Sequence, residues 1–217
     1  MTMTTLKENI DAYDAAKKER LPAEVLDTMA RCTEELKLEG IEQRALRKGD
    51  TMPDFKLPNQ HGEPRRLYDY LSSAPLVLNI YRGGWCPYCN MEMKALHDVL
   101  PEIRALGATL VGLSPESPDK ATETALANEI DIDILSDSGN KIADQMGLVF
   151  VLPEALRSLY KNIGIDIPAH NGDSSFKLPV PATYIIGKDG VIAFDFVNSD
   201  YTRRLEPSEI VRALKGI

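Results

Sequence analysis

The chain has 217 residues, 43% of them hydrophobic and 27% charged, a composition typical of a globular protein large enough to fold without disulfide cross-links. Its 33 acidic residues outnumber its 25 basic ones, and a net charge of −8 repels a nucleic-acid backbone on average. No segment approaches the roughly 20 apolar residues that span a bilayer, and residues 1–10 lack the layout of a secretion signal. We therefore expect a cytoplasmic protein with neither a nucleic-acid nor a membrane partner.

Residues 1–47 are predicted to form a helical extension of two or three helices, broken near Leu21 and Pro22. Apolar residues recur in this segment at helical spacing: Leu6, Ile10, Tyr13, Val25, Met29 and Leu36. Such an extension buries little by itself, so we expect it to pack on the rest of the chain or to form a homodimer with a second copy. Cys32 lies in this segment and is expected to be a small buried apolar residue.

Residues 48–217 carry the pattern of an α/β domain with a mixed central sheet flanked by helices. Strands are predicted at 53–57, 76–81, 109–113, 132–135, 182–186 and 191–197, and helices at 87–106, 117–127, 140–146, 155–162 and 208–214. Residues 66–68 are expected to return as the second strand of a hairpin. The succession of strand, helix and strand from 76 to 113 predicts a right-handed parallel crossover.

Cys86 and Cys89 stand where the helix of this crossover begins, directly before and two residues after Pro87. Unpaired backbone N–H groups and the helix dipole stabilise a thiolate at such a position, so Cys86 is predicted to be the nucleophile. Residues three apart on a helix share one face at roughly 5 to 6 Å, so Cys89 can close a disulfide with Cys86. The pair therefore indicates thiol redox chemistry.

A zinc site is the competing interpretation of two cysteines separated by two residues, and it needs two further ligands. Cys32, His61, His97 and His170 are scattered and offer no second paired motif. We therefore expect neither a metal nor another cofactor. Inert structural cysteines are the other alternative, and the Gly-Gly-Trp sequence before Cys86 is unusual for them.

Residues 79–93, which read Asn-Ile-Tyr-Arg-Gly-Gly-Trp-Cys-Pro-Tyr-Cys-Asn-Met-Glu-Met, resemble the active-site segment of the AhpC/TSA peroxiredoxin-like branch of the thioredoxin superfamily. The likeness extends from Gly49 to the C-terminus. It implies a thioredoxin-like fold, with Trp85 and Pro181 shaping the pocket. It also implies a cis peptide bond at Pro181, facing the cysteine pair.

The sequence departs from true peroxiredoxins at the residues that organise the peroxide. Their active site has Pro, three residues, Thr, two residues and then the peroxidatic Cys; by this spacing Arg82 replaces the Pro, Cys86 the Thr, and Cys89 takes the peroxidatic position. Their second-strand Arg falls where Pro181 stands. Arg82 is expected to favour the Cys86 thiolate and to compensate in part. Arg203 and Arg204 are weaker candidates for the same role, and the favoured alternative for this pair is that both are solvated surface residues.

The predicted function is a Cys86/Cys89 dithiol-disulfide cycle that reduces disulfides, with hydroperoxides as a second substrate class, at the expense of a thiol reductant such as thioredoxin or glutathione. One alternative is a dedicated thiol-dependent hydroperoxide reductase. The other is a redox sensor in which the pair toggles a binding surface without turnover. The irregular segment 153–179 is expected to border the site and to select substrates.

Overall fold

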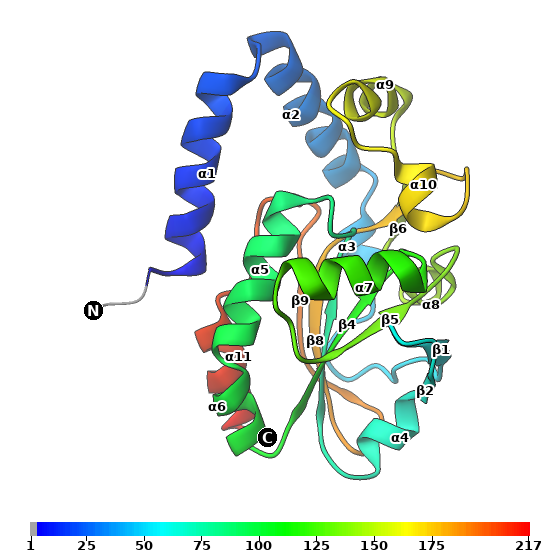
Figure 1. Cartoon of the computed structure of the whole chain (residues 1–217). Helices are drawn as coiled ribbons and strands as arrows, with labels where there is room; N and C mark the ends of the chain where they lie inside the picture. Colours follow the sequence, from blue (N-terminus) through cyan, green and yellow to red (C-terminus); the bar gives the residue numbers. More distant parts are fainter. Residues whose placement is uncertain (1–3) are drawn as a thin grey trace.

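The computed structural model describes residues 4–217, which fold around a five-stranded mixed sheet (Figure 1). The sheet has the strand order β5-β4-β3-β8-β9. Its members are β3 (Leu76–Ile80), β4 (Thr109–Ser114), β5 (Asp133–Ser136), β8 (Ala182–Ile186) and β9 (Ile192–Val197). Strands β3, β4 and β5 are parallel, and β8 runs antiparallel to both β3 and β9. The predicted parallel crossover and the hairpin at 182–197 are confirmed.

Helices cover both faces of the sheet, and each face has its own apolar core. One face packs against α1 (Leu6–Arg20), α5 (Pro87–Asp98), α6 (Leu100–Ala105), α7 (Pro118–Ala127) and α11 (Pro207–Leu214). The other packs against α3 (Ile41–Arg44), α4 (Leu67–Leu71) and α8 (Lys141–Gln145). The alternation of side chains along each strand supplies apolar residues to both cores, which is why β3 is buried at every position.

A third apolar cluster joins the N-terminal segment to the irregular part of the chain between β5 and β8. It contains residues of α2 (Ala23–Leu38), α9 (Glu154–Asn162) and α10 (Ile167–Asn171), and of the strand β7 (Lys177–Pro179), which pairs with β6 (Val149–Val151). Cys32 is buried in this cluster, as predicted. The small sheet of β6 and β7 and the helix α10 were not predicted, because each is too short to show periodicity.

Two elements differ from the sequence prediction. The helix predicted at 87–106 ends at Asp98 and restarts at Leu100. Pro101 explains this break because its ring blocks helical continuation and it has no N–H to donate. The hairpin of β1 (Lys56–Pro58) and β2 (Pro64–Arg66) is confirmed, but it passes directly into the one-turn helix α4, where a longer strand was expected.

The N-terminal helices form an arch over one end of the sheet, and we use "the arch" for α1, the bend at Leu21 and Pro22, and α2 (Figure 1). Helix α1 begins with a capping box of Thr5 and Glu8. It ends before Pro22, which confirms the predicted break. It packs on α5, while α2 packs on α9. The extension therefore packs on the rest of its own chain, and an interface with a second copy stays a prediction.

Glu206, which precedes α11, fixes the start of α1. Its carboxylate accepts hydrogen bonds from the backbone N–H groups of Leu6 and Lys7 at 3.3 and 2.6 Å. A carboxylate at a helix N-terminus also interacts favourably with the helix dipole. Within residues 4–217, no helix is long and apolar enough to cross a membrane.

Candidate active site

The cysteine pair lies at the junction between β3 and α5. A loop of Arg82, Gly83, Gly84 and Trp85 leads out of the strand, and Cys86 is the N-cap residue of α5 with Pro87 in the first turn. The Cys86 carbonyl accepts the first helical hydrogen bond, from the N–H of Asn90 at 3.1 Å. The thiol of Cys86 therefore stands at the helix N-terminus, where a negative charge is favoured.

The two thiols differ in what they face. Cys86 is only 1% exposed, yet it lines a cavity of about 500 Å³ beneath the bend of the arch. Cys89 is 0% exposed, lies one turn deeper in α5 and is not part of the cavity wall. Both thiols are reduced in this structure. A small molecule in the cavity can thus reach Cys86 and not Cys89.

The charges around the pair favour ionisation of the outer thiol. Burial opposes it, but hydrogen bonding to Cys89 and the positive charges of Arg82 and Arg204 outweigh burial and lower the pKa of Cys86 to about 5. Burial raises the pKa of Cys89 well above its ordinary value, and the hydrogen bond to Cys86 and its charge add to that rise. One thiolate on Cys86, stabilised by a neutral Cys89, is the resulting state near neutral pH.

Arg82 is buried and contributes to the cavity wall beside Cys86. Its guanidinium lies over the rings of Trp85 and Tyr201, 4.8 and 4.6 Å from their centroids, and donates a hydrogen bond to the Tyr160 hydroxyl at 2.9 Å. Stacking on aromatic faces holds the guanidinium in place without a carboxylate partner. Its charge is therefore not neutralised by an acid, which leaves it free to stabilise a thiolate.

Of the two alternatives for Arg203 and Arg204, a surface position is correct for Arg203 and wrong for Arg204. The Arg204 side chain is 1% exposed, whereas that of Arg203 is 67% exposed. Arg204 forms an ion pair with the buried Glu92, and it donates a hydrogen bond to the Cys89 sulfur at 3.4 Å. Pro181 stands where true peroxiredoxins have their second-strand arginine. Arg204, from the segment after β9, nevertheless brings a guanidinium to Cys89, the cysteine that aligns with the peroxidatic position.

A signal for this ion pair was present in the sequence. Glu92 shares the face of α5 that carries Cys89 and Leu96, and that face is buried. A carboxylate on a buried helix face requires a cation or several hydrogen bonds. The sequence therefore indicates that Glu92 has a buried cationic or hydrogen-bonding partner, but it does not identify Arg204 as that partner.

Pro181 is buried immediately before β8, next to the end of β3 in the sheet, but it is not part of the cavity wall. No cis peptide bond occurs within residues 4–217, so the expected cis bond at Pro181 was wrong. The preceding residues run extended from β7, where the Val180 N–H donates to the Leu148 carbonyl at 2.8 Å. An extended approach to proline suits the more stable trans isomer.

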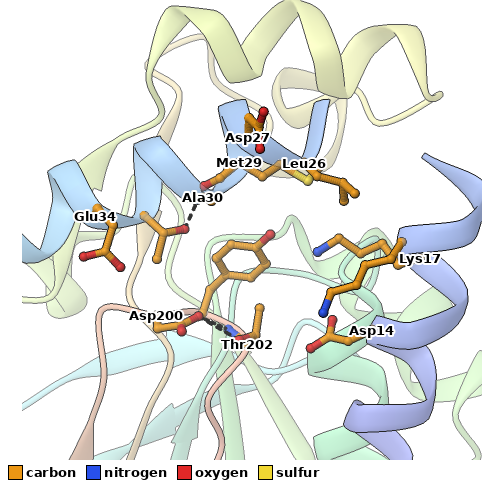
Figure 2. Close-up of a pocket in the computed structure, with 12 residues that line it drawn as sticks. Asp14, Lys17, Leu26, Asp27, Met29, Ala30, Glu34, Asp200 and Thr202 are labelled. Atoms are coloured by element: carbon orange, nitrogen blue, oxygen red, sulfur yellow. Dashed lines mark hydrogen bonds between the residues drawn. The ribbon is translucent and has the colours of Figure 1, made fainter. Parts of the chain in front are cut away.

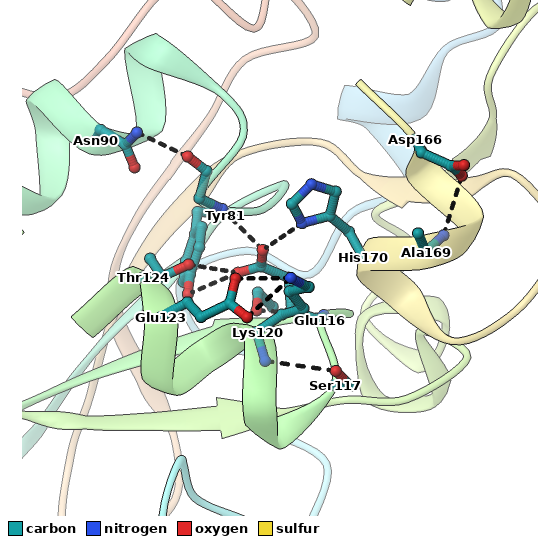
Figure 3. Close-up of polar contacts among 12 residues, drawn as sticks. Tyr81, Asn90, Glu116, Ser117, Lys120, Glu123, Thr124, Asp166, Ala169 and His170 are labelled. Atoms are coloured by element: carbon teal, nitrogen blue, oxygen red, sulfur yellow. Dashed lines mark hydrogen bonds and ion pairs between the residues drawn. The ribbon is translucent and has the colours of Figure 1, made fainter. Parts of the chain in front are cut away.

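Glu116 holds the loop that precedes Cys86 through a hydrogen bond, a role that the sequence did not reveal (Figure 3). Its buried carboxylate accepts hydrogen bonds from the Gly84 N–H at 3.0 Å and from the Thr124 hydroxyl at 3.2 Å. The His170 ring lies 3.4 Å away, on the segment between β5 and β8. The buried carboxylate thus connects the loop before Cys86 with α7 and α10.

The segment 153–179 borders the cavity, as expected. Tyr160, Ile163 and Ile165 contribute one wall, and the arch contributes the opposite wall. Within residues 4–217, no group of three or more His, Cys, Asp or Glu side chains is placed to hold a metal ion. Cys32 packs with Leu152 and Leu156, in a cluster separate from the apolar core that holds the cysteine pair.

Fold and site together define a redox protein of the thioredoxin superfamily: a paired thiol at a helix N-terminus, beside a mixed sheet with helices on both faces. The model of the AhpC/TSA family matches residues 48–195. The chain therefore belongs to the AhpC/TSA family. Membership confirms the predicted fold and places the chain among the thiol-dependent peroxidases and oxidoreductases.

Individual relatives agree with this assignment. The chain is 36% identical over 103 residues to a putative peroxiredoxin of Mycobacterium tuberculosis, an alignment that covers 48% of this chain and 67% of the relative. It is 30% identical over 103 residues to peroxiredoxin Bcp of Escherichia coli, covering 48% of this chain and 65% of the relative. The chain thus spans about two thirds of the length of these relatives.

Solved structures show the same fold. The crystal structure of peroxidoxin BcpB from Mycobacterium tuberculosis superposes with a TM-score of 0.63 at 26% identity, covering 79% of this chain and 98% of that one. A cysteine mutant of PrxQ from Xylella fastidiosa superposes with a TM-score of 0.62 at 17% identity, covering 79% of this chain and 96% of that one. The family model begins at residue 48, so α1 and α2 lie outside the family match.

Proposed function

We propose that the protein reduces hydroperoxides, with Cys86 as the attacking thiolate and Cys89 as the resolving thiol. The observation that carries this proposal is the placement of Cys86 in the wall of a cavity beneath the arch, with Cys89 buried outside that wall. A cavity of about 500 Å³ admits a small molecule. The arch stands between Cys86 and any folded protein that carries a disulfide.

The proposed cycle balances in three steps. The Cys86 thiolate attacks the terminal oxygen of a hydroperoxide ROOH, the O–O bond breaks, and ROH leaves with a proton while Cys86 becomes a sulfenic acid. The Cys89 sulfur then displaces the sulfenic hydroxyl as water and forms the Cys86–Cys89 disulfide. Two external thiols reduce this disulfide by exchange and are themselves oxidised to a disulfide.

Arg82 and Arg204 have separate roles in this proposal. Arg82 stabilises the Cys86 thiolate before attack. Arg204 touches the Cys89 sulfur and stabilises the negative charge that develops when this thiol loses its proton during resolution. Trp85 and Tyr201 hold Arg82 in position.

The test follows hydroperoxide consumption with a thioredoxin-type dithiol reductant, glutathione being assayed in parallel. Cys86→Ser should abolish turnover, and Cys32→Ser should retain it, because Cys32 lies outside the mechanism. Oxidation of the protein by a protein disulfide faster than by any hydroperoxide would overturn the proposal in favour of disulfide exchange. Oxidation without any recycling would indicate a redox sensor. The cytoplasmic location stays a prediction.

A further inference from the structure

The cavity in front of Cys86 has walls that select a particular kind of molecule. Its aromatic side chains are Tyr13, Trp85, Tyr88, Tyr160 and Tyr201. Five further apolar side chains complete this lining: Leu21, Met29, Pro87, Ile163 and Ile165. At about 500 Å³ the cavity is far larger than hydrogen peroxide requires, since water occupies only about 30 Å³ per molecule in the liquid. These walls suit an apolar body of several carbon atoms.

The charged side chains in the cavity wall are all basic. Lys17, Arg20 and Arg82 line it, and no Asp or Glu belongs to its lining. This is notable in a chain with a net charge of −8. Ionised Cys86 offsets one positive charge. The carboxylates of Asp14 and Asp200 lie near Lys17 but outside this lining. Arg82 stands beside Cys86, whereas Lys17 and Arg20 come from the last turn of α1.

An adjoining cavity of about 330 Å³ within the arch shows the opposite balance (Figure 2). It is lined by the carboxylates of Asp14, Asp27, Glu34 and Asp200 and by only two lysines, Lys17 and Lys18. Figure 2 shows Asp14 and Lys17 on α1 facing Leu26 and Met29 on α2. Of these two cavities, the carboxylates of the arch therefore line only the one within the arch, whereas Lys17 lines both and Arg20 lines the one that contains Cys86.

Lys17 is held at the cavity wall by a defined contact. Its ammonium donates a hydrogen bond to the Tyr88 hydroxyl at 2.9 Å, and that hydroxyl donates to Asp14. Arg20 makes a weaker contact, a 3.5 Å hydrogen bond to the Tyr13 hydroxyl. A guanidinium with most of its five donors unused can accept an anionic partner in a bidentate manner.

We propose that this cavity binds an anionic amphiphile, and that the substrate of Cys86 is an organic hydroperoxide with a carboxylate on an apolar body. Lys17 and Arg20 pair with the carboxylate, the aromatic and aliphatic walls hold the body, and the peroxide oxygen meets the Cys86 thiolate. This inference rests on the proposed function for its reaction but not for its binding step. Because both basic side chains belong to α1, the arch sets this specificity.

The binding step can be measured without any peroxide. Trp85 is the single tryptophan of the chain and lines the cavity, so its fluorescence reports occupancy. Reduced full-length protein is titrated with decanoate, decanol and decylammonium. We expect decanoate to bind about tenfold more tightly than decanol, as one to two partly shielded ion pairs provide, and decylammonium to bind most weakly.

Matched variants connect this preference to the arch. Lys17→Met combined with Arg20→Met keeps the apolar stems and removes both charges, so the affinities for decanoate and decanol should become equal. Arg20→Lys should restore part of the preference. Lys18→Met, on the same helix but in the neighbouring cavity, should retain the full preference. Equal binding of all three amphiphiles by the unchanged protein, or a preference that survives the double variant, would overturn the inference.

The reaction is tested with two substrates, the hydroperoxide of an unsaturated C18 acid and the methyl ester of the same hydroperoxide. Each rate is divided by the rate of the same protein with hydrogen peroxide. The acid should react about tenfold faster than the ester, and the double variant should lose this ratio. Equal rates for acid and ester contradict the inference alone. A Cys86 that no hydroperoxide oxidises contradicts the proposed function, while preferential decanoate binding would still support the cavity assignment.

Discussion

Cys86 and its surroundings explain why one of two adjacent thiols should react. Both are buried, but only Cys86 lines the cavity and only its pKa is lowered. With a pKa of about 5, the thiol is ionised at neutral pH. Arg82, held by stacking rather than by an ion pair, supplies a positive charge that no neighbouring carboxylate cancels.

This pKa predicts the pH dependence of alkylation. The rate at which iodoacetamide modifies Cys86 follows the thiolate fraction, so it should be constant above about pH 6 and fall about tenfold per pH unit once the pH is below the pKa. Tandem mass spectrometry of the modified peptide gives the rate at Cys86 at each pH and distinguishes it from Cys89, whose pKa is raised. A rate that keeps rising up to pH 8 or 9 would show an ordinary, unactivated thiol.

Arg204 predicts a separate effect on resolution. Replacing it alone leaves Glu92 buried without a partner, so the informative variant is Arg204→Met with Glu92→Gln. The second, slower phase of oxidation, in which Cys89 attacks Cys86, should slow about tenfold because the Cys89 thiolate loses one charge-assisted hydrogen bond. Arg203→Met is the matched exposed control. An unchanged second phase in the double variant would remove Arg204 from the mechanism.

At the scale of elements, the loop before Cys86 is held by close packing. A Cβ atom on Gly84 would lie 2.1 Å from the Thr124 hydroxyl oxygen and 3.0 Å from its Cβ. Thr124 would have to move, and its hydrogen bond to Glu116 would be lost. Gly84→Ala should therefore lower the free energy of unfolding by about 1 to 3 kcal/mol, measured by urea denaturation.

Gly216 provides the control for this substitution, because a Cβ there meets the Ala213 carbonyl oxygen only at 3.4 Å. Gly216→Ala should leave the stability unchanged to within about 0.5 kcal/mol. Equal free energies of unfolding for the Gly84 and Gly216 variants would show that the loop before Cys86 can accommodate a methyl group, which would contradict the packing described.

Tyr88 joins the cysteine segment to the arch. Its hydroxyl bonds both Lys17 and Asp14 of α1, and its ring packs edge-on against Tyr13 and Tyr201. Tyr88→Phe keeps the ring and removes both hydrogen bonds, so it should destabilise the docking of α1 by about 1 to 2 kcal/mol. Hydrogen exchange of α1 amides should accelerate, and that of β3 amides should not. Unaltered exchange in α1 would show that the hydroxyl contributes nothing to docking.

Long elements with clear periodicity could be predicted from the sequence, and those that depend on tertiary contacts could not. The buried strands β3, β4 and β8 and the helices α1, α2 and α7 agree with prediction. The interruption of the helix at Val99 follows from Pro101, although the apolar stripe of the sequence continues across it. Strands β6 and β7 are each three residues long, and they pair residues that lie about 28 positions apart in the chain. No local sequence pattern encodes such a pairing.

The same division holds for the candidate site. Cys86, Cys89, Trp85 and Arg82 are consecutive or nearly so, and their sequence spacing alone indicated a redox site. Arg204 lies 115 residues from Cys89, with most of the chain's strands between them. Its approach is set by the path of the loop after β9, so only the folded chain reveals it.

For the whole molecule, the arch distinguishes this chain from the family core that begins at residue 48. It covers the cavity and, with the segment 153–179, leaves Cys86 open to small molecules. In the proposed cycle the regenerating thiol must reach the Cys86–Cys89 disulfide, so we expect recycling by a protein reductant to require that α1 move away from α5. Recycling by a small dithiol requires no such movement.

This difference predicts how crosslinking affects recycling. A disulfide-independent crosslink between an introduced residue on α1 and one on α5 should slow reduction by a thioredoxin-type protein at least about tenfold, because a closed arch excludes it. Reduction by dithiothreitol should be affected far less. Equal slowing of both reductants, or of neither, would contradict the gating role of the arch.

The most direct test concerns which sulfur meets the peroxide, because alignment with the family places Cys89 on the peroxidatic position whereas the structure exposes only Cys86 to the cavity. Cys89→Ser and Cys86→Ser are each treated with one equivalent of hydroperoxide in the presence of dimedone, and the labelled peptide is identified by mass spectrometry. The account predicts a stoichiometric adduct on Cys86 in the first variant and none on Cys89 in the second. A sulfenic acid captured on Cys89, with Cys86 unlabelled, would contradict it.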